Sequence, residues 1–410
     1  MMGQTEKRKR KVKSLHVRPI SEVARSVGIR KKYLESYGEH TAKLSLDLLR
    51  IIKNKKRGKY VIVTSVTPTP FGEGKTITAI GLSMALGRLK KRSIPCVTQS
   101  PISNIFGTRG VGLGAGMCQL FPVEDANLHL TGDTHAIQSA HNLCAAYLDN
   151  SIFNGNPLDI NPDHVLWKRV LDVEDRALRY INTGLGSKTD GISRKTGFEF
   201  ITASELAAIV ALAENMKDLR ERIGRIIVAI TRKEKPVTCE DIKAAGAMTV
   251  LLKNAIKPNL LQTTEGTPCL VHALSSGDVG LGVTSVIADR IALGLSEYAI
   301  VETGFGAELG AEKFFDIKCR TSDIKPDLAV IVCSVRALKM HSNDFEISAD
   351  KQLPRELLRE NISAIERGLS NLEKQIENVK TFGIPVVICI NRFNNDTDKE
   401  ISAIEKRVKD

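Results

Sequence analysis

Short runs of apolar, β-branched residues recur along the chain, separated by longer stretches of helical periodicity. Continuous apolar runs are typical of parallel strands buried on both faces. The intervening stretches, for example Ile77–Leu89 and Ser204–Ile223, carry apolar residues along one helical face. The alternation predicts an α/β fold with a doubly wound, mostly parallel sheet, helices on both faces, and a second α/β portion. The expected strands are Tyr60–Val66, Ile226–Ile230, Tyr298–Val301, Leu328–Cys333 and Pro385–Ile390.

Two segments depart from this alternation. Residues 1–14 are rich in Lys and Arg and are expected to form a basic flexible tail ahead of a body at 15–410. Residues 151–198 contain scattered Asn, Asp, Gly and Pro, which predicts an irregular excursion from the body rather than a linker.

The net charge of +12 belongs to the N-terminal end of the chain. Residues 1–60 hold 18 Lys/Arg against 5 Asp/Glu, whereas the remaining residues hold 41 against 42. The run from Lys7 to Lys13 is either a nuclear-import or nucleic-acid patch or a solvated tail. No aromatic residue is interleaved to stack on bases, and the body is neutral, so nucleic acid is disfavoured as a partner.

The remaining composition favours a cytoplasmic location, with nuclear import as the weaker alternative. No apolar run approaches the ~20 residues that a membrane span requires, and the N-terminus has no apolar segment resembling a signal peptide. Eight cysteines are scattered without a C-x-x-C pair, as expected of free thiols in a reducing compartment.

A phosphate-binding loop is the sharpest local signal. It follows one expected strand and precedes the helical pattern from Ile77, the context that a Walker A loop requires. Backbone N–H groups and the helix N-terminus would hold the phosphates of ATP, Lys75 would neutralise their charge, and Thr76 would ligate Mg²⁺. Thr69 stands where the motif has its first glycine; the alternative is a fortuitous Gly-Lys-Thr turn. The residues expected to bind the nucleotide are Thr69, Pro70, Phe71, Gly72, Glu73, Gly74, Lys75 and Thr76.

A second segment of candidate residues follows the loop. Phe106–Gly116 contains five glycines, which permit close approach to a ligand but also serve packing. Asp133 and His135 could act as a base, as metal ligands or as turn and cap residues. Their spacing alone favours the structural reading.

Several motifs together resemble the formate–tetrahydrofolate ligase family in its single-function prokaryotic form. The resemblance extends from about Ser14 to Asp410, with motif order and spacing in agreement. It rests on TPTPFGEGKT, PVEDANLHLTGDTHAI, KNAIKPNLLQT, VETGFGAELGAEKFFDIKCR, VRALKMH and GIPVVICINRFNNDT. It implies a P-loop NTPase-like fold and an enzyme that makes formyl phosphate from ATP and formate, then transfers the formyl group to N10 of tetrahydrofolate.

The resemblance also implies roles for particular residues. Lys75 and Thr76 would bind the ATP phosphates and Mg²⁺, with a monovalent cation as a further candidate cofactor. Asp133 would lie beside the folate amine, where a carboxylate accepts a proton or orients N10. Phe393 would stack on the pterin ring. Formate and tetrahydrofolate are the expected substrates, and a homo-oligomer is a candidate because the family forms oligomers.

Three departures from the family pattern bear on activity. Thr98 replaces the arginine that clamps formyl phosphate, and loss of one such donor typically costs ~10²–10³ in rate; Arg109 is a candidate substitute. Residues 274–282 replace a polar and aromatic loop of the family. Chains of the family continue past the position of Asp410, and the resemblance implies that this further part supplies a second aromatic face for folate. A degenerate homologue that binds nucleotide with little or no ligase activity is therefore the alternative to an active ligase.

Overall fold

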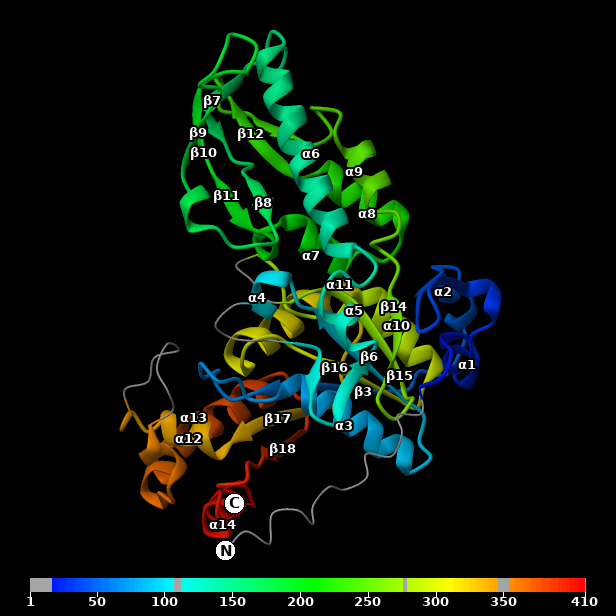
Figure 1. Cartoon of the computed structure of the whole chain (residues 1–410), viewed down its shortest axis with the longest axis vertical. Helices are drawn as coiled ribbons and strands as arrows, with labels where there is room; N and C mark the ends of the chain where they lie inside the picture. Colours follow the sequence, from blue (N-terminus) through cyan, green and yellow to red (C-terminus); the bar gives the residue numbers. More distant parts are fainter. Residues whose placement is uncertain (1–16, 107–111, 276–278, 346–353, 410) are drawn as a thin grey trace, which may run out of the picture.

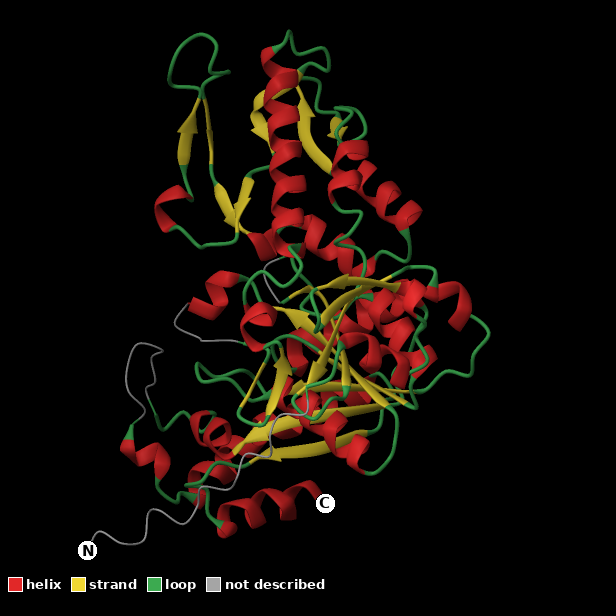
Figure 2. Cartoon of the chain, turned by 45° about the vertical axis from the view of Figure 1, so that its right-hand side comes forward, coloured by secondary structure: helices red, strands yellow, loops and turns green. Residues whose placement is uncertain are grey.

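A large, mostly parallel sheet forms the centre of the protein (Figures 1 and 2). The computed structural model describes residues 17–106, 112–275, 279–345 and 354–409. The strand order is β1-β2-β14-β15-β4-β16-β3-β17-β18, with β6 pairing beside β14 and β5 beside β6. Neighbouring strands run parallel from β15 to β18, whereas β1, β2 and β14 pair antiparallel. The strands are β1 (Leu34–Tyr37), β2 (Thr41–Leu44), β3 (Lys59–Ser65), β4 (Ser93–Gln99), β5 (Gly114–Ala115), β6 (Cys118–Phe121), β14 (Asn259–Thr263), β15 (Pro268–Leu274), β16 (Tyr298–Glu302), β17 (Leu328–Ser334) and β18 (Val386–Asn391).

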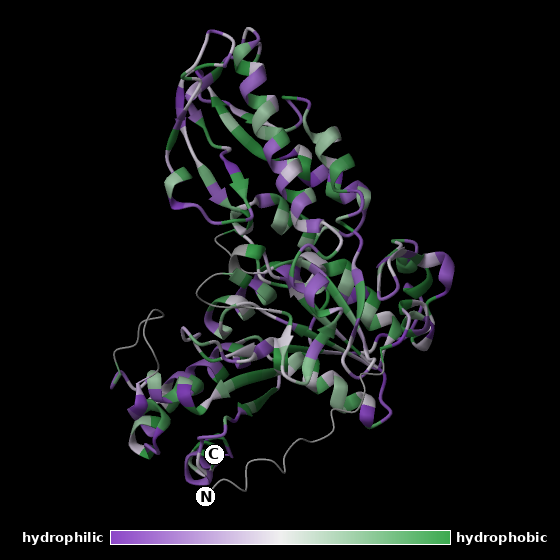
Figure 3. Ribbon diagram, viewed as in Figure 1, coloured by the Kyte–Doolittle hydropathy of each residue, from purple (hydrophilic) through white to green (hydrophobic). Residues whose placement is uncertain are grey.

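Helices cover both faces of this sheet. Along β3, Val61 and Val63 pack with Ala79 of α3 (Lys75–Arg88), whereas Ile62 belongs to the core on the other face, with α10 (Val286–Leu295). The strand residues are correspondingly hydrophobic across the centre of the molecule (Figure 3). The predicted doubly wound α/β sheet is confirmed. The other helices around it are α1 (Ile20–Ser26), α2 (Leu48–Ile52), α4 (Ile102–Phe106), α5 (Val123–Asn127), α11 (Arg320–Ser322), α12 (Val335–Met340), α13 (Ile362–Thr381) and α14 (Asp398–Lys409).

A second α/β portion lies above the sheet in Figure 1 and is also as predicted. The long helix α6 (Asp133–Phe153) runs upward from the sheet, and small sheets with the orders β13-β12-β7, β10-β9 and β11-β8 lie beside it. Residues 151–198 contain β7 to β10. The elements are β7 (Ile160–Val165), β8 (Arg169–Leu171), β9 (Ile181–Thr183), β10 (Arg194–Thr196), β11 (Phe198–Phe200), α7 (Glu205–Leu212), α8 (Met216–Gly224), β12 (Ile227–Thr231), β13 (Pro236–Thr238) and α9 (Ala245–Leu251).

Two expectations about elements of this portion are wrong. The apolar run near Ile227–Thr231 is strand β12, but it pairs antiparallel with β7 and β13 and lies outside the parallel sheet. Only residues 232–235 separate β12 from β13, too few for the crossover that parallel pairing requires. The helix expected over Ser204–Ile223 is two helices, because the Asn215 side chain accepts from the N–H groups of Lys217 and Asp218 and starts α8 anew.

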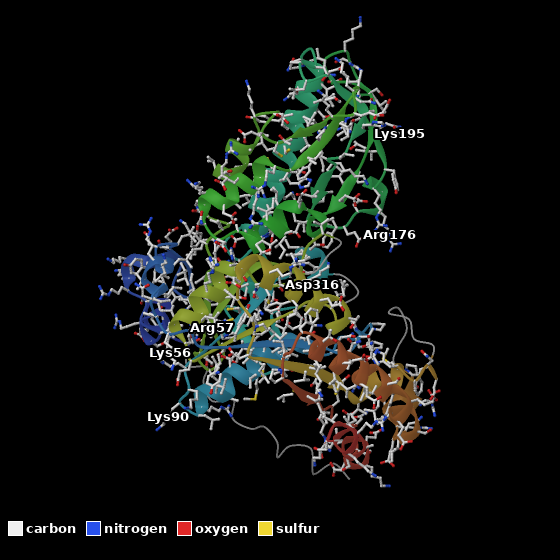
Figure 4. All side chains as sticks on the ribbon, turned by 180° about the vertical axis from the view of Figure 1, so that it is seen from behind. Lys56, Arg57, Lys90, Arg176, Lys195 and Asp316 are labelled. Atoms are coloured by element: carbon white, nitrogen blue, oxygen red, sulfur yellow. The ribbon has the colours of Figure 1, made fainter. Side chains whose placement is uncertain are left out.

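Charged side chains lie on the surface of the protein. Exposed charged residues such as Lys56, Lys90 and Lys195 extend away from the ribbon (Figure 4). All eight cysteines are free thiols. None of the helices in the described part of the chain combines the length and apolarity needed to cross a membrane. The run Lys7–Lys13 lies outside the described residues.

Candidate active site at the phosphate loop

The phosphate loop joins the carboxyl end of β3 to the first residue of α3. Gly72 and Gly74 have φ values of 72° and 85°, a left-handed conformation that glycine adopts without steric cost. Gly74 is the N-cap of α3, and Lys75 is the first helical residue. Thr69 has no left-handed backbone, so a residue with a Cβ fits where the motif has glycine. The loop therefore places the N-terminus of a fourteen-residue helix at the carboxyl end of β3, where backbone N–H groups can bind an anion.

The Glu73 side chain braces this loop from inside. Glu73 is buried, and its Oε1 accepts from the backbone N of Thr69 at 2.9 Å while its Oε2 accepts from Ser334 Oγ at 3.1 Å. Asn391, at the end of β18, donates to the Glu73 carbonyl oxygen at 3.0 Å. Phe71 is exposed at the loop tip. Residues at the ends of β17 and β18 thus fix the shape of the loop. Because the carboxylate and the carbonyl oxygen of Glu73 are used in these contacts, its backbone N–H is the group left to bind a phosphate.

Lys75 points back toward the end of β3. Its Nζ donates to Ser65 Oγ at 3.3 Å. Burial lowers the pKa of Lys75, and the negative charges of Glu302, Glu73 and Glu308 oppose that shift. Burial also raises the pKa of Glu308, which lies in the π-helical segment Ala307–Ala311 after β16. The Lys75 ammonium therefore lies in a desolvated position where an anionic ligand interacts with it strongly.

Glu302 connects the phosphate loop to Thr98. Glu302 is the last residue of β16, which lies between β3 and β4 in the sheet. Its Oε2 accepts from Thr76 Oγ1 at 2.6 Å, and its Oε1 accepts from both the N and Oγ1 of Thr98, at 3.0 and 3.1 Å. Three neighbouring parallel strands thus bring together the Lys75–Thr76 pair, the expected formyl-phosphate residue and a carboxylate. In open α/β sheets this carboxyl edge is where ligands bind.

Asp133 lies farther along the same edge. It is the first residue of α6, and its carboxylate pairs with Lys43 Nζ at 2.7 Å and accepts from Asn259 Nδ2 at 2.8 Å. His135, by contrast, is exposed, and its ring nitrogen contacts Ser139 Oγ at 3.4 Å on the same helix. No group of three or more His, Cys, Asp or Glu side chains within the described ranges could hold a metal ion.

Phe393 follows the carboxyl end of β18, the outermost parallel strand on the side of the sheet away from β14. Its backbone N donates to Asp396 Oδ2 at 2.8 Å, and the Arg336 guanidinium lies 4.0 Å from its ring centroid. Phe393 is half-buried, and Arg336 of α12 covers one face of its ring. The structure does not bring Phe393 and Asp133 into contact, because Asp133 rests on β14 and the strand order sets β14 and β18 six places apart.

The glycine-rich segment Phe106–Gly116 and the 274–282 loop lie partly outside the described residues. Arg109 and residues 276–278 are not among them. Around the second loop, Leu274 and Leu281 are buried, and the N of Gly280 donates to the Thr202 carbonyl oxygen at 2.7 Å. The described part of the 274–282 loop therefore contacts the second portion at Thr202, just before α7.

The sequence reasoning missed Glu302, Asn391, Lys43 and Asn259. Glu302 and Asn391 each end a parallel strand, and this position could have nominated them, because side chains there converge on one edge. Asn259 lies in KNAIKPNLLQT, a motif that was used only for the family resemblance. Lys43 carries no such signal, since its contact with Asp133 joins residues 90 positions apart in the sequence.

Comparison with known proteins agrees with this geometry. The sequence profile of the Formate–tetrahydrofolate ligase family matches residues 9–410. The chain is similar to the formate–tetrahydrofolate ligase of Desulforamulus reducens, with 50% identity over 95% of this chain and 69% of the relative. It is also similar to formate–tetrahydrofolate ligase 3 of Rubrobacter xylanophilus, with 49% identity over 96% and 69%, and to the ligase of Cutibacterium acnes, with 48% over 95% and 69%. The chain therefore belongs to the formate–tetrahydrofolate ligase family.

Proposed function

We propose that the protein ligates formate to tetrahydrofolate at the expense of ATP, giving 10-formyltetrahydrofolate through formyl phosphate. The observation that carries the proposal is the meeting of Lys75, Thr76, Thr98 and Glu302 at the ends of three adjacent parallel strands. Family membership supplies the substrates and the ATP dependence.

The phosphate loop supplies the first half of this reaction. Backbone N–H groups from Glu73 to Thr76 and the α3 N-terminus are suited to hold the ATP phosphates. Lys75 is placed to neutralise charge that accumulates on the transferred phosphoryl group. Its low-dielectric surroundings, indicated by a pKa lowered through burial, strengthen that attraction.

Thr76 and Glu302 fit an oxygen-preferring divalent cation. Mg²⁺ is bound through few protein oxygens together with substrate phosphates, and the hydroxyl and carboxylate here lie 2.6 Å apart beside the loop. When bound, the ion would neutralise phosphate charge. The monovalent cation and the homo-oligomer remain predictions without a nominated residue.

Acceptor binding forms the second half of the proposal. Asp133 is proposed to face the tetrahydrofolate amine. Phe393 keeps one ring face open opposite Arg336, but six strand spacings, about 29 Å, separate β18 from β14. Stacking of Phe393 on the pterin ring therefore stays a prediction that this arrangement of the strands does not support. Formyl phosphate would lie next to Thr98, the position that the family fills with arginine. The Thr98 hydroxyl donates a hydrogen bond to Glu302. Unlike an arginine, Thr98 brings no positive charge to formyl phosphate.

The proposal is tested by product formation with the purified full chain. Incubation with ATP, Mg²⁺, formate and tetrahydrofolate is expected to yield 10-formyltetrahydrofolate, measured after acid conversion to the methenyl form. Omission of any one substrate should abolish the product, and Lys75→Ala is the matched inactive control. ATP binding without formate-dependent product would instead support the alternative of a homologue that binds nucleotide without turnover.

A further inference from the structure

Lys43 of β2 forms a buried cluster with Asp133 and Asn259. Its Nζ lies 2.7 Å from Oδ1 and 2.9 Å from Oδ2 of Asp133, so one ammonium contacts both carboxylate oxygens. Asn259 Nδ2 donates to Oδ2 at 2.8 Å, and Thr131 Oγ1 donates to Asn259 Oδ1 at 2.6 Å. The side chains of Lys43 and Asp133 are 0% and 8% exposed. The carboxylate is therefore held in one orientation, with only a narrow edge accessible.

Strand register places this cluster close to Thr98. Lys43 is opposite Asn259, Asn259 is opposite Val271, and Val271 is paired with Val97, the residue before Thr98. Two strand spacings separate Asn259 from Val97, which is about 10 Å. An acceptor molecule lying along the carboxyl edge can therefore contact Asp133 while its amine approaches a formyl group at Thr98.

Of the basic side chains described around Asp133, Lys43 is the one whose charge pairs with the carboxylate. Lys257 faces the cluster through its carbonyl oxygen, which accepts from Lys43 at 2.9 Å, while its ammonium pairs with Glu35 at 2.6 Å. His272 of β15 is also nearby, but burial lowers the pKa of His272 to about 4, so it is neutral at pH 7. Burial lowers the pKa of Lys43, and the charge of Asp133 opposes that shift.

A buried ion pair is weak evidence for stability, because an apolar pair of similar volume is often as stable. The geometry of the Lys43–Asp133 pair instead indicates a role in orienting a substrate amine. An amine that attacks a carbonyl must present its lone pair, and a fixed acceptor for its N–H sets that orientation. Lys43 and Asn259 occupy the other lone pairs of the carboxylate and prevent its rotation.

We propose that Lys43 is a positioning residue of the acceptor half of the site, which holds the Asp133 carboxylate in the orientation that receives the tetrahydrofolate amine. This inference rests on the proposed function. It assigns Lys43 no contact with the substrate; the side chain acts through Asp133.

The test measures tetrahydrofolate affinity, ATP affinity and thermal midpoint for Lys43→Met. Tetrahydrofolate binding is expected to weaken about tenfold or more, with ATP binding unchanged within about twofold. Lys318→Met is the matched control, because Lys318 and Asp289 form a comparably buried pair, 2% and 0% exposed. Asp289 accepts from the Tyr60 hydroxyl near the start of β3, roughly 17 Å along the strand from the phosphate loop. This control should lower the thermal midpoint and leave both affinities unchanged.

A second variant separates positioning from folding. Lys43→Met leaves Asp133 buried without its cation, so Lys43→Met with Asp133→Asn removes the charge imbalance and should recover thermal stability. Tetrahydrofolate affinity should stay as low in the double variant as in either single variant, because residues that act as a unit are not additive. Recovery of affinity in the double variant, or wild-type affinity in folded Lys43→Met, would overturn the inference.

The inference and the proposed function fail in different ways. A wild type that binds tetrahydrofolate but forms no product would refute the ligase proposal, and a selective loss in Lys43→Met would still support the role of Lys43. A wild type that does not bind tetrahydrofolate would refute both.

Discussion

Thr98 is held against Glu302 by two hydrogen bonds, from its backbone N and its hydroxyl to the same carboxylate oxygen at 3.0 and 3.1 Å. The second oxygen of Glu302 accepts from Thr76. One carboxylate therefore links the phosphate loop to position 98, where the family resemblance implies an arginine. A residue introduced at position 98 must accommodate Glu302 before it can contact a substrate.

We predict a low ligase rate for the wild type and little gain from Thr98→Arg. Residues that act as a unit are not additive, so an arginine restored alone at position 98 should recover little rate. Residues 274–282 also differ from the family pattern. We expect a change of less than about tenfold in the formate-dependent rate, since a whole donor is typically worth ~10²–10³. Thr98→Val, similar in volume and uncharged, is the comparison. A hundredfold rise would show that a single arginine is sufficient.

Lys75→Ala should weaken ATP–Mg²⁺ binding by at least about tenfold, because a hydrogen bond to a charged group contributes roughly 1.5–3 kcal/mol. Isothermal titration of the full chain measures the change. Lys56→Ala, which removes an exposed lysine away from the loop, should bind as the wild type does. Equal affinity of the two variants would refute the assignment of the loop.

Gly74→Ala should destabilise the protein more than Gly72→Ala. Both substitutions place a side chain at a left-handed φ, which costs about 1–2 kcal/mol. A Cβ at Gly74 would also lie 2.5 Å from Asn391 Nδ2, whereas one at Gly72 would meet no atom within 4 Å. Relief requires Asn391 to release the Glu73 carbonyl, so we expect about 1 kcal/mol or more of additional loss. Urea unfolding of both variants checks this order, and equal losses would contradict it.

Stability should fall as the pH is lowered from about 6.5 to 4. Burial lowers the pKa of His141 and of His272 to about 4, from an ordinary value of 6.5. In that window the unfolded chain binds protons that the folded chain does not, so acid favours unfolding by up to roughly 3 kcal/mol for each histidine.

Urea unfolding at several pH values measures the effect of these histidines. His272→Gln should reduce the slope of stability against pH in this window, even if it lowers stability at every pH. His164→Gln, at an exposed position, should leave the slope unchanged. Identical slopes for the wild type and His272→Gln would contradict a neutral buried His272.

The part of the site that could be predicted from the sequence is the phosphate loop, whose residues are close together in the chain. The order of strand, loop and helix around Lys75 follows from apolar runs and from two glycines that need left-handed backbone. The sequence did not predict which sheet contains β12, because a short apolar run has the same pattern in a parallel and in an antiparallel sheet. A helical pattern across 204–223 likewise did not reveal the break at Asn215, where a side chain caps a new helix.

The sequence by itself determined the fold class, the phosphate loop and the resemblance to formate–tetrahydrofolate ligases, because each depends on residues close together in the chain. Tertiary structure decided the partners: Glu302 with Thr76 and Thr98, Asn391 with the phosphate loop, and Lys43 with Asp133. Each of these contacts joins residues 90 or more positions apart. They arise because adjacent strands of a sheet end at a common edge, and strand order is a property of the folded chain.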